Sequence, residues 1–327
     1  MKLVPDVLLK MAVTLACAVA ATAAMAAYPD KPIKVLTPFP PGGQVPTIAY
    51  LLSQRMGTLL GQPFVLETRA GAAGTIAATF VAKAPKDGYT LLFATSSMLG
   101  IAKYMYKDLA YDPVVDFAPV IYLGNVTVGV FASPQAGFNS LDQLVSAARA
   151  NPGKINFSSP GVGSVSHLAG ELFKSRAQLD LTHVPYQGFA AQMTDLIGGR
   201  TELAIAGMAS GLSYVRDGRV KLIAVASKSR SKMMPDVPAL GERLPGYDAP
   251  AWLGIVAPSG IPAEALERLE WAAQEALKDP ETIKTLEAQG LDLEVMTRRG
   301  FAEKIRRDLP LWEEAVKASS ARAPETR

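Results

Sequence analysis

The chain has 327 residues, of which 33 are lysine or arginine and 30 are aspartate or glutamate, for a net charge of +3 at neutral pH. A small net charge without a block of basic residues argues against a nucleic-acid-binding protein. Once the N-terminal segment is set aside, about 300 residues remain, which exceeds one ordinary hydrophobic core and suffices for two lobes.

The N-terminus has the three-part layout of a secretory signal peptide. Lys2 and Lys10 carry positive charge, an apolar run covers residues 11–21, and Ala24-Met25-Ala26 offers a cleavage site. The run is shorter than the roughly 20 apolar residues that a bilayer-spanning helix requires. We therefore predict a cleavable signal peptide at 1–26 and an exported, soluble mature protein.

The single cysteine, Cys17, lies inside this segment. The mature chain therefore has no disulfide, no thiol nucleophile and no cysteine metal ligand. Lipidation of Cys17 is the alternative, but Thr14 stands where lipoprotein signals usually carry a larger aliphatic residue.

Short apolar runs alternate with helical patterns in the first part of the mature chain. We predict strands at 33–37, 64–67 and 89–94, and helices at 46–60 and 75–84. Strands that alternate with helices are typical of α/β folds with right-handed crossovers and mostly parallel sheets.

A second α/β unit begins near residue 126. We predict its strands at 126–132, 155–158, 181–184, 203–206 and 221–226, and its helices at 140–150, 165–176 and 190–197. The last third is predicted to hold a strand at 252–257, a helix from about 262 to 278, and helices at 281–288 and 300–318. The first of these helices carries an apolar face every three to four residues.

No catalytic constellation stands out in the sequence. The two histidines, His167 and His183, lack metal-ligand spacing, and the zincin and nucleophile-elbow patterns are missing. For His183, which lies in an apolar run, we favour a structural hydrogen bond. We therefore expect no catalytic residue, no metal site and no cofactor.

Three loops rich in glycine and hydroxyl residues each follow a predicted strand and precede a helix. They are Pro41-Gly42-Gly43, Thr95-Ser96-Ser97 and Ser158–Ser166. In open α/β sheets, ligands bind beyond the carboxyl ends of the strands. Helix N-termini there expose unpaired N–H groups and the positive end of the helix dipole, which together favour an anion. For any one loop, a plain turn or helix cap is the alternative.

Several ordered segments span the mature chain and match one protein family. They are Tyr28–Lys34, Pro38–Gly43, Ala82–Leu92, Ser166–Phe173, His183–Gly188, Pro235–Pro238 and Trp252–Pro258. In these residues the chain resembles the Bug family, the substrate-binding receptors of tripartite tricarboxylate transporters.

The resemblance implies a two-lobed periplasmic-binding-protein fold, similar to type II. It implies two mostly parallel sheets with helices on both faces and a ligand cleft between the lobes. Lobe one is expected at 27–125 plus 250–327, and lobe two at 126–249. The hinge segments are expected near Gly124–Thr127 and Ala249–Trp252.

The resemblance also implies a function. We expect a non-enzymatic, monomeric receptor that captures a small organic carboxylate in the periplasm, either a di- or tricarboxylate or an aromatic carboxylate. Closure of the lobes would deliver the ligand to membrane permease subunits. Two alternatives stay open: a sensory receptor that reports the same ligand to a signalling partner, and a periplasmic enzyme on the same fold.

The three loops and the resemblance together supply the expected ligand-binding residues. Gly42, Gly43 and Gln44 are expected to grip one carboxylate, and the hydroxyls of the second and third loops to complete the site. The full set is Phe39, Gly42, Gly43, Gln44, Thr95, Ser96, Ser97, Ser164, Ser166, His167, Tyr186, Gln187, Phe189 and Met208. For His167 the alternative is a structural hydrogen bond.

Three departures from the family pattern bear on the ligand. Many relatives carry an aspartate where this chain has Pro46, and Asp-Asn where it has Ala206-Gly207. Phe189 stands where small residues are common. The cleft has thus lost acidic groups, which favours an uncharged ligand body over an amino acid. Phe189 and Met208 are equally compatible with the hydrophobic core.

Overall fold

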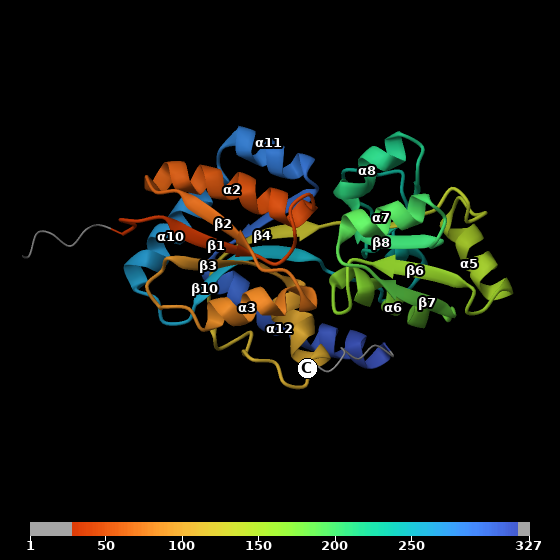
Figure 1. The fold of residues 1–327 in the computed structure, drawn as a ribbon, viewed down its shortest axis with the longest axis horizontal. Helices are drawn as coiled ribbons and strands as arrows, with labels where there is room; N and C mark the ends of the chain where they lie inside the picture. The colour runs from red at the N-terminus through yellow and green to blue at the C-terminus, as the bar shows by residue number, and fades with distance from the viewer. Residues whose placement is uncertain (1–27, 320–327) are drawn as a thin grey trace, which may run out of the picture.

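The computed structural model describes residues 28–319 and holds two β-sheets, each flanked by helices (Figure 1). The predicted signal peptide lies outside the described residues. Within residues 28–319, no helix is both long and apolar enough to cross a bilayer. We call the six-stranded sheet with its helices the first lobe, and the five-stranded sheet with its helices the second lobe.

The first lobe contains strands from both ends of the described chain. In sheet order they are β11 (Leu291–Met296), β4 (Phe117–Val126), β10 (Trp252–Pro258), β3 (Thr90–Thr95), β1 (Ile33–Thr37) and β2 (Phe64–Thr68). β1 runs parallel to β2 and β3, whereas β10 runs antiparallel to β3 and β4.

Helices cover both faces of this sheet because successive apolar residues of its strands point to opposite sides. One face carries α2 (Gln44–Leu60), α10 (Ala263–Ala276) and α11 (Pro280–Ala288). The other carries α3 (Thr75–Ala82), the π-helical turn η2 (Ser97–Ile101) with α4 (Ala102–Met105), and α12 (Arg298–Ala318). A short 3-10 turn, η1 (Ala72–Gly74), precedes α3. Val35 packs with the α2 face and its neighbour Leu36 with the α3 face.

The second lobe is smaller and follows the same alternation. Its strands in sheet order are β7 (Leu181–Pro185), β6 (Ile155–Ser159), β8 (Leu203–Gly207), β5 (Val128–Ala132) and β9 (Lys221–Val225). Its helices are α5 (Leu141–Ala150), α6 (Val165–Ala177), α7 (Phe189–Ile197), α8 (Met208–Arg216) and α9 (Leu240–Arg243). Val130 points toward the α6 side of the sheet, and Phe131 toward α7, where it packs on Met193.

The two-lobed α/β class predicted from the sequence is confirmed, but the expectation of mostly parallel sheets is wrong. Both sheets are mixed, because β10 and β5 each pair antiparallel with two neighbours. Parallel pairing requires a long crossover, usually a helix. These two strands instead enter their sheets directly from the other lobe, so they need no crossover helix.

The sequence analysis did not predict the short elements η1, η2, α4 and α9, nor the longer elements β4, α8 and β11. β4 contains Pro119, which argues against an interior strand; in the fold Pro119 lies at a register shift opposite Val256. α8 contains Gly211, a poor helix former that closely approaches the Phe131 ring. β11 is an edge strand that pairs only with β4 in the described sheet.

The chain passes between the lobes twice. Thr127 alone separates β4 of the first lobe from β5 of the second, and the return runs through residues 249–251 into β10. The lobes also touch away from these passages, where Arg176 of α6 forms an ion pair with Glu314 of α12 at 3.2 Å.

Candidate functional site

A cavity of about 220 Å³ lies where loops and strand ends of the two lobes meet. Its lining residues, in chain order, are Phe39, Pro40, Pro41, Gly42, Gly43, Gln44, Val45, Pro46, Thr95, Ser96, Ser97, Val126, Val128, Pro160, Ser164, Val165, Ser166, Gln187, Gly188, Phe189, Ala190, Ala206, Gly207, Ser210, Ala251, Trp252 and Leu253. All three loops singled out from the sequence therefore contribute to one cavity.

Four helices of nine or more residues begin at this cavity: α2, α6, α7 and α8. Three of them have a glycine at the N-cap and no side-chain cap hydrogen bond, namely Gly43, Gly188 and Gly207. The first N–H groups of a helix have no intrahelical partner, and the dipole makes this end positive. The arrangement offers an anion several N–H donors without a cationic side chain.

The loop before α2 places its backbone on the cavity. Gly42 has φ +92°, a left-handed conformation that glycine adopts without strain. Gln44 starts α2 and is 7% exposed; its Nε2 donates to the carbonyl of Gln289 at 2.6 Å. A Cβ on Gly207 would lie 2.5 Å from Gln44 Oε1, so the Gln44 amide lies between the lobes.

The end of β3 presents two hydroxyls that have no protein partner. Thr95 and Ser96 are 5% and 0% exposed, and neither Thr95 Oγ1 nor Ser96 Oγ makes a hydrogen bond within the described residues. A buried polar group without a partner carries a desolvation cost, so such groups in native proteins require an explanation. Neither oxygen has accessible surface, so a ligand or water would supply the missing bonds only after the surrounding side chains move.

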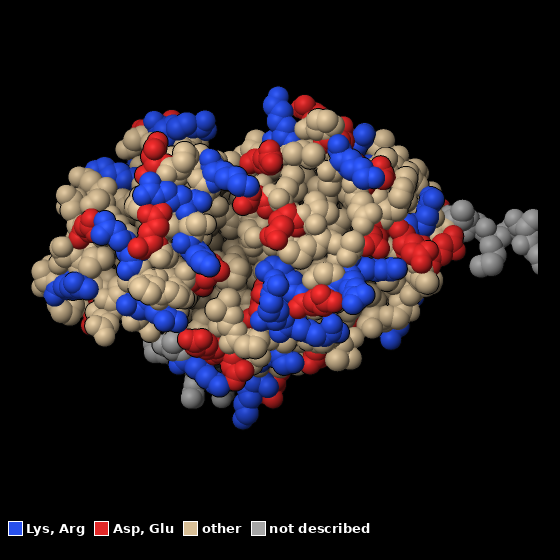
Figure 2. Space-filling model, turned by 180° about the vertical axis from the view of Figure 1, so that it is seen from behind, with Lys and Arg blue, Asp and Glu red and all other residues tan. Residues whose placement is uncertain are grey.

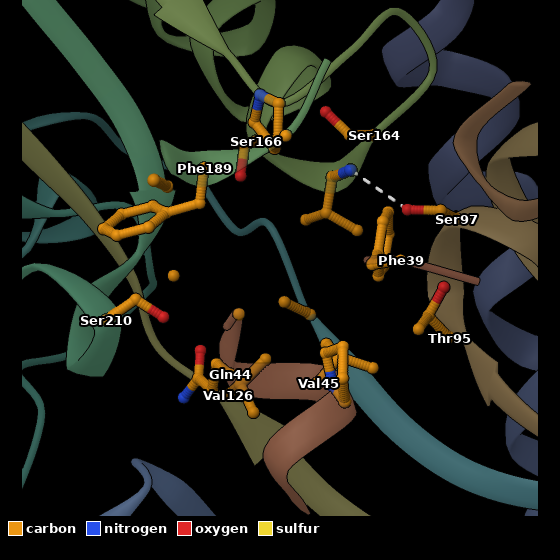
Figure 3. Close-up of a pocket in the computed structure, with 18 of the residues that line it drawn as sticks. Phe39, Gln44, Val45, Thr95, Ser97, Val126, Ser164, Ser166, Phe189 and Ser210 are labelled. Carbon is orange, nitrogen blue, oxygen red and sulfur yellow. Dashed lines mark hydrogen bonds between the residues drawn. The ribbon is translucent and has the colours of Figure 1, made fainter. Parts of the chain in front are cut away.

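The third loop joins the two lobes at the start of α6. The N–H of Val165 in the second lobe donates to Ser97 Oγ in the first lobe at 3.1 Å, the bond drawn in Figure 3. Ser164 caps the helix by accepting from the N–H of His167 at 3.2 Å. The Ser166 side chain is directed into the cavity (Figure 3).

The wall supplied by the second lobe is mainly apolar. Phe189, Val128 and Ala206 line it, with the Ser210 hydroxyl beside Phe189 (Figure 3). Gln187 is exposed at the margin. Phe189 therefore belongs to the cavity lining, although its ring also packs on the second-lobe core, with its centroid 6.3 Å from that of Tyr214.

Three residues of the predicted ligand set do not line the cavity. Met208 is 1% exposed and packs with Val225 and Val237 in the second-lobe core. The Tyr186 hydroxyl donates to Asp195 at 2.7 Å. Burial and this bond raise the Tyr186 pKa to about 12.

His167 is the third, and its contacts are those of a structural residue. It is 1% exposed, its Nδ1 accepts from the N–H of Gly163 at 3.2 Å, and its ring stacks on His183 with centroids 4.0 Å apart. His183 in turn shares a 2.7 Å hydrogen bond with Ser159 Oγ. Burial lowers the pKa of His167 to about 3 and that of His183 to about 4, with smaller contributions from neighbouring positive charge.

The sequence analysis missed several lining residues. Val126 and Val128 flank the first passage between the lobes, and Ala251, Trp252 and Leu253 follow the second. The predicted hinge segments contained Val126, Ala251 and Trp252, and they ended one residue before Val128 and Leu253. Ser210 had no such signal because the helix that carries it, α8, was not predicted.

None of the residues lining the cavity is ionisable. Within residues 28–319, no group of three or more acidic, histidine or cysteine side chains could hold a metal ion. On the face drawn in Figure 2, acidic and basic side chains are interspersed around the indentation between the lobes. The cavity must therefore balance a ligand's charge with N–H groups and hydroxyls.

Comparison with known proteins identifies a family. Residues 48–319 match the family described as tripartite tricarboxylate transporter family receptor. The protein BugT of Bordetella pertussis is 33% identical over 310 residues, which cover 93% of this chain and 94% of BugT.

Two solved structures with similar folds hold carboxylates. An R. palustris protein with adipate is 29% identical, with a TM-score of 0.84 over 89% of this chain and 98% of that protein. MatC from Rhodopseudomonas palustris, with bound malate, is 30% identical, with a TM-score of 0.80 over 88% of this chain and 100% of MatC.

Proposed function

Because this chain belongs to the tripartite tricarboxylate transporter receptor family, we propose that it is a periplasmic solute-binding protein for a small organic carboxylate. It is exported by the signal peptide at 1–26 and delivers its ligand to the membrane permease subunits of a tripartite transporter. The observation that carries the ligand class is the pair of buried, unpartnered hydroxyls of Thr95 and Ser96 beside four helix N-termini.

The proposed ligand shell consists of the predicted residues that line the cavity. It comprises Phe39, Gly42, Gly43, Gln44, Thr95, Ser96, Ser97, Ser164, Ser166, Gln187 and Phe189. The backbone of the first loop and the Thr95–Ser96 hydroxyls bind a carboxylate from the first lobe. The starts of α6 and α7 approach it from the second lobe. His167, Tyr186 and Met208 are left out because their side chains serve the second-lobe interior or bond elsewhere.

Delivery requires that the lobes close on the ligand and reopen at the transporter. We assign lobe one to 27–125 plus 250–327 and lobe two to 126–249, with hinges at Gly124–Thr127 and Ala249–Trp252. The position of Thr127 between β4 and β5 supports the first hinge. The 3.1 Å bond between Ser97 and Val165 is a contact that closure would make and opening would break.

The protein binds without chemical change. The residues lining the cavity include no cysteine, histidine, lysine or carboxylate that could act as a base or nucleophile partner for the serines. The ligand should therefore be recovered intact after incubation with the protein.

A thermal-shift screen of the mature protein against mono-, di- and tricarboxylates tests this function. A ligand at 100 times its Kd stabilises by about 2.7 kcal/mol, which shifts the Tm measurably. We expect at least one carboxylate to raise the Tm while its uncharged amide does not. If no carboxylate binds, or if the ligand is steadily converted to product, the proposed function is wrong.

A further inference from the structure

We propose that Gln44 of the first lobe and Gly207 of the second form a contact that fixes the closed position of the lobes, which makes both of them positioning residues for ligand capture. The inference rests on the carboxylate-receptor function proposed above and deepens it. It adds a second contact beside the cavity to the bond between Ser97 and Val165.

Gly207 is a glycine that its own backbone does not require. Its φ of −53° and ψ of 121° are open to any residue, and no side-chain cap bond is made at this N-cap of α8. A Cβ on Gly207 would nevertheless lie 2.5 Å from Gln44 Oε1, and the three nearest atoms beyond its neighbours in the chain all belong to Gln44. The need for a glycine here therefore comes from the first lobe.

The Gln44 side chain is held in place by its own lobe. Its Nε2 donates to the carbonyl of Gln289 at 2.6 Å, and the residue is 7% exposed. A carbonyl oxygen only accepts hydrogen bonds, so the amide nitrogen faces Gln289 and the amide oxygen faces Gly207. Moving the amide away from a side chain at position 207 would disturb this bond, so the amide resists displacement.

A second glycine completes the contact from the first lobe. Gly290 lies between α11 and β11 at φ +79°, and a Cβ there would lie 2.7 Å from Gln44 Nε2 and 2.7 Å from Ala209 Cβ. The start of α8 therefore rests on both Gln44 and the Gly290 backbone. Because Gly207, Ala209 and Gly290 are all small, the two lobes approach each other closely at this point.

This contact lies away from the bond between Ser97 and Val165. Gln44 lies beside Ser210 of α8, at a distance from Ser97 and Ser164 (Figure 3). In Figure 1, α8 lies on the side of α2 and α11, whereas α6 lies on the side of α12. One contact would leave the lobes free to twist about the hinge, but two separated contacts fix a single closed arrangement. The fit between Gln44 and Gly207 should therefore set the population of the closed state, and with it the ligand affinity.

Calorimetric titration of a double-mutant cycle tests the proposal, with adipate, malate and benzoate as probes. We expect Gly207→Ala to weaken the tightest-binding probe at least about fivefold, because the added Cβ overlaps Gln44 Oε1. In the Gln44→Ala protein the same substitution should change the Kd less than about twofold, because the overlap is gone. Stopped-flow measurements should find the effect of Gly207→Ala mainly in the dissociation rate.

Two further measurements separate this role from folding. The Tm of unliganded Gly207→Ala should stay within about 3 °C of that of the unmodified protein, because the backbone suits alanine and no side-chain cap is lost. Gly198→Ala is the matched control. Gly198 is an exposed glycine at the end of α7 with φ −74°, and an added Cβ would lie 3.4 Å from its nearest neighbour. This control should leave the Kd within about twofold of its original value.

An unchanged Kd in Gly207→Ala would overturn the inference, as would an equal loss of affinity with and without Gln44. A much larger fall in the Tm of unliganded Gly207→Ala would also overturn it, because the second lobe itself would then require the glycine. Failure of all three probes to bind the unmodified protein would instead overturn the proposed function, together with the inference that rests on it.

Discussion

The two walls of the cavity have similar local structure but present different side chains. Both present strand ends, glycines and helix starts, yet the first-lobe wall carries Thr95, Ser96 and the Gly42–Gly43 backbone, whereas the second-lobe wall carries Phe189, Val128 and Ala206. The first wall holds hydroxyls that lack a partner within residues 28–319, and the second combines the Phe189 ring with the hydroxyls of Ser164, Ser166 and Ser210. Walls of similar local structure can therefore differ in chemistry, because the side chains at their strand ends differ.

Adding a charge to the first-lobe wall should have the largest effect on this division. Pro46 is buried in the first turn of α2 and lines the cavity. We expect Pro46→Asp to weaken carboxylate binding at least 100-fold, about 2.7 kcal/mol, through like-charge repulsion in a site of low polarity. Pro46→Ala, which adds an N–H but no charge, should bind at least as tightly as the unmodified protein. Calorimetric titration measures both, and unaltered affinity in Pro46→Asp would mean that this position does not face the ligand.

The affinity for amino acids tests the same lack of charged side chains in the cavity. Plain carboxylates should bind at least tenfold, about 1.4 kcal/mol, more tightly than amino acids of similar size, because an ammonium group finds no acidic partner. In Pro46→Asp this difference should shrink. A preference of the unmodified protein for the amino acid would contradict the proposed neutral cavity.

Acid should destabilise the second lobe while leaving ligand affinity nearly constant. The pKa values of His167 and His183 are lowered to about 3 and about 4, whereas unfolded histidine titrates near 6.5. Below about pH 6.5 the unfolded chain therefore binds protons that the folded chain does not, and stability falls as the pH falls. From pH 7.5 to 5 we expect a loss of about 2 kcal/mol for the buried His167 and less for His183.

Urea denaturation at the two pH values measures this loss. Replacing both histidines with glutamine should flatten the dependence on pH, because glutamine does not titrate. A carboxylate that stays ionised should bind with similar affinity from pH 6 to 8, since no residue lining the cavity is ionisable. A steep change in affinity over that range would contradict this.

Removing one unpartnered hydroxyl should have a smaller effect. Thr95→Val keeps the shape of the side chain and should weaken carboxylate binding by about 1 kcal/mol, roughly fivefold, with little loss of stability. Thr37→Val is the matched control, because Thr37 ends the neighbouring strand β1 but bonds to Thr68 Oγ1 and does not line the cavity. Equal effects of the two variants on affinity would remove Thr95 from the ligand shell.

The contact between the lobes should have the smallest effect. Ser97→Ala removes the acceptor for the Val165 N–H and should weaken binding by roughly 0.5–1 kcal/mol. Ser97→Thr keeps an acceptor oxygen and should restore most of the affinity. Small-angle scattering should show a smaller radius of gyration with ligand in both variants, and the absence of that change in the unmodified protein would contradict lobe closure.

Local sequence features were sufficient to find the loops that build the site. Gly42–Gly43, Thr95–Ser97 and Ser164–Ser166 follow strands and precede helices. Parallel pairing of β1 and β3 brings the first two loops to one edge of the first-lobe sheet, whereas the third follows β6 of the second-lobe sheet. The strands and helices around them were also predictable, because their apolar residues repeat with the period of each element. Elements that contain an unfavourable glycine or proline, such as β4 with Pro119, could not be predicted in this way.

The direction of individual side chains could not be predicted from these local sequence features. His167 and Ser166 are adjacent in the chain, yet Ser166 reaches the cavity while His167 stacks on His183 behind it. Met208 and Ser210 lie on one helical turn, but only Ser210 lines the cavity. A one-residue step rotates a side chain by about 100° around a helix, so which residue faces a ligand depends on how the helix packs.

The amino-acid sequence by itself determined the α/β class, the family and the three loops that meet at the cavity. These properties follow from residue type and short-range spacing. Only the tertiary structure decided that the sheets are mixed, that the Thr95 and Ser96 hydroxyls have no partner within residues 28–319, and that Phe189 lies across the cavity from Thr95. These properties depend on contacts between residues far apart in the chain, whose geometry is set by the packing of two lobes rather than by any local pattern.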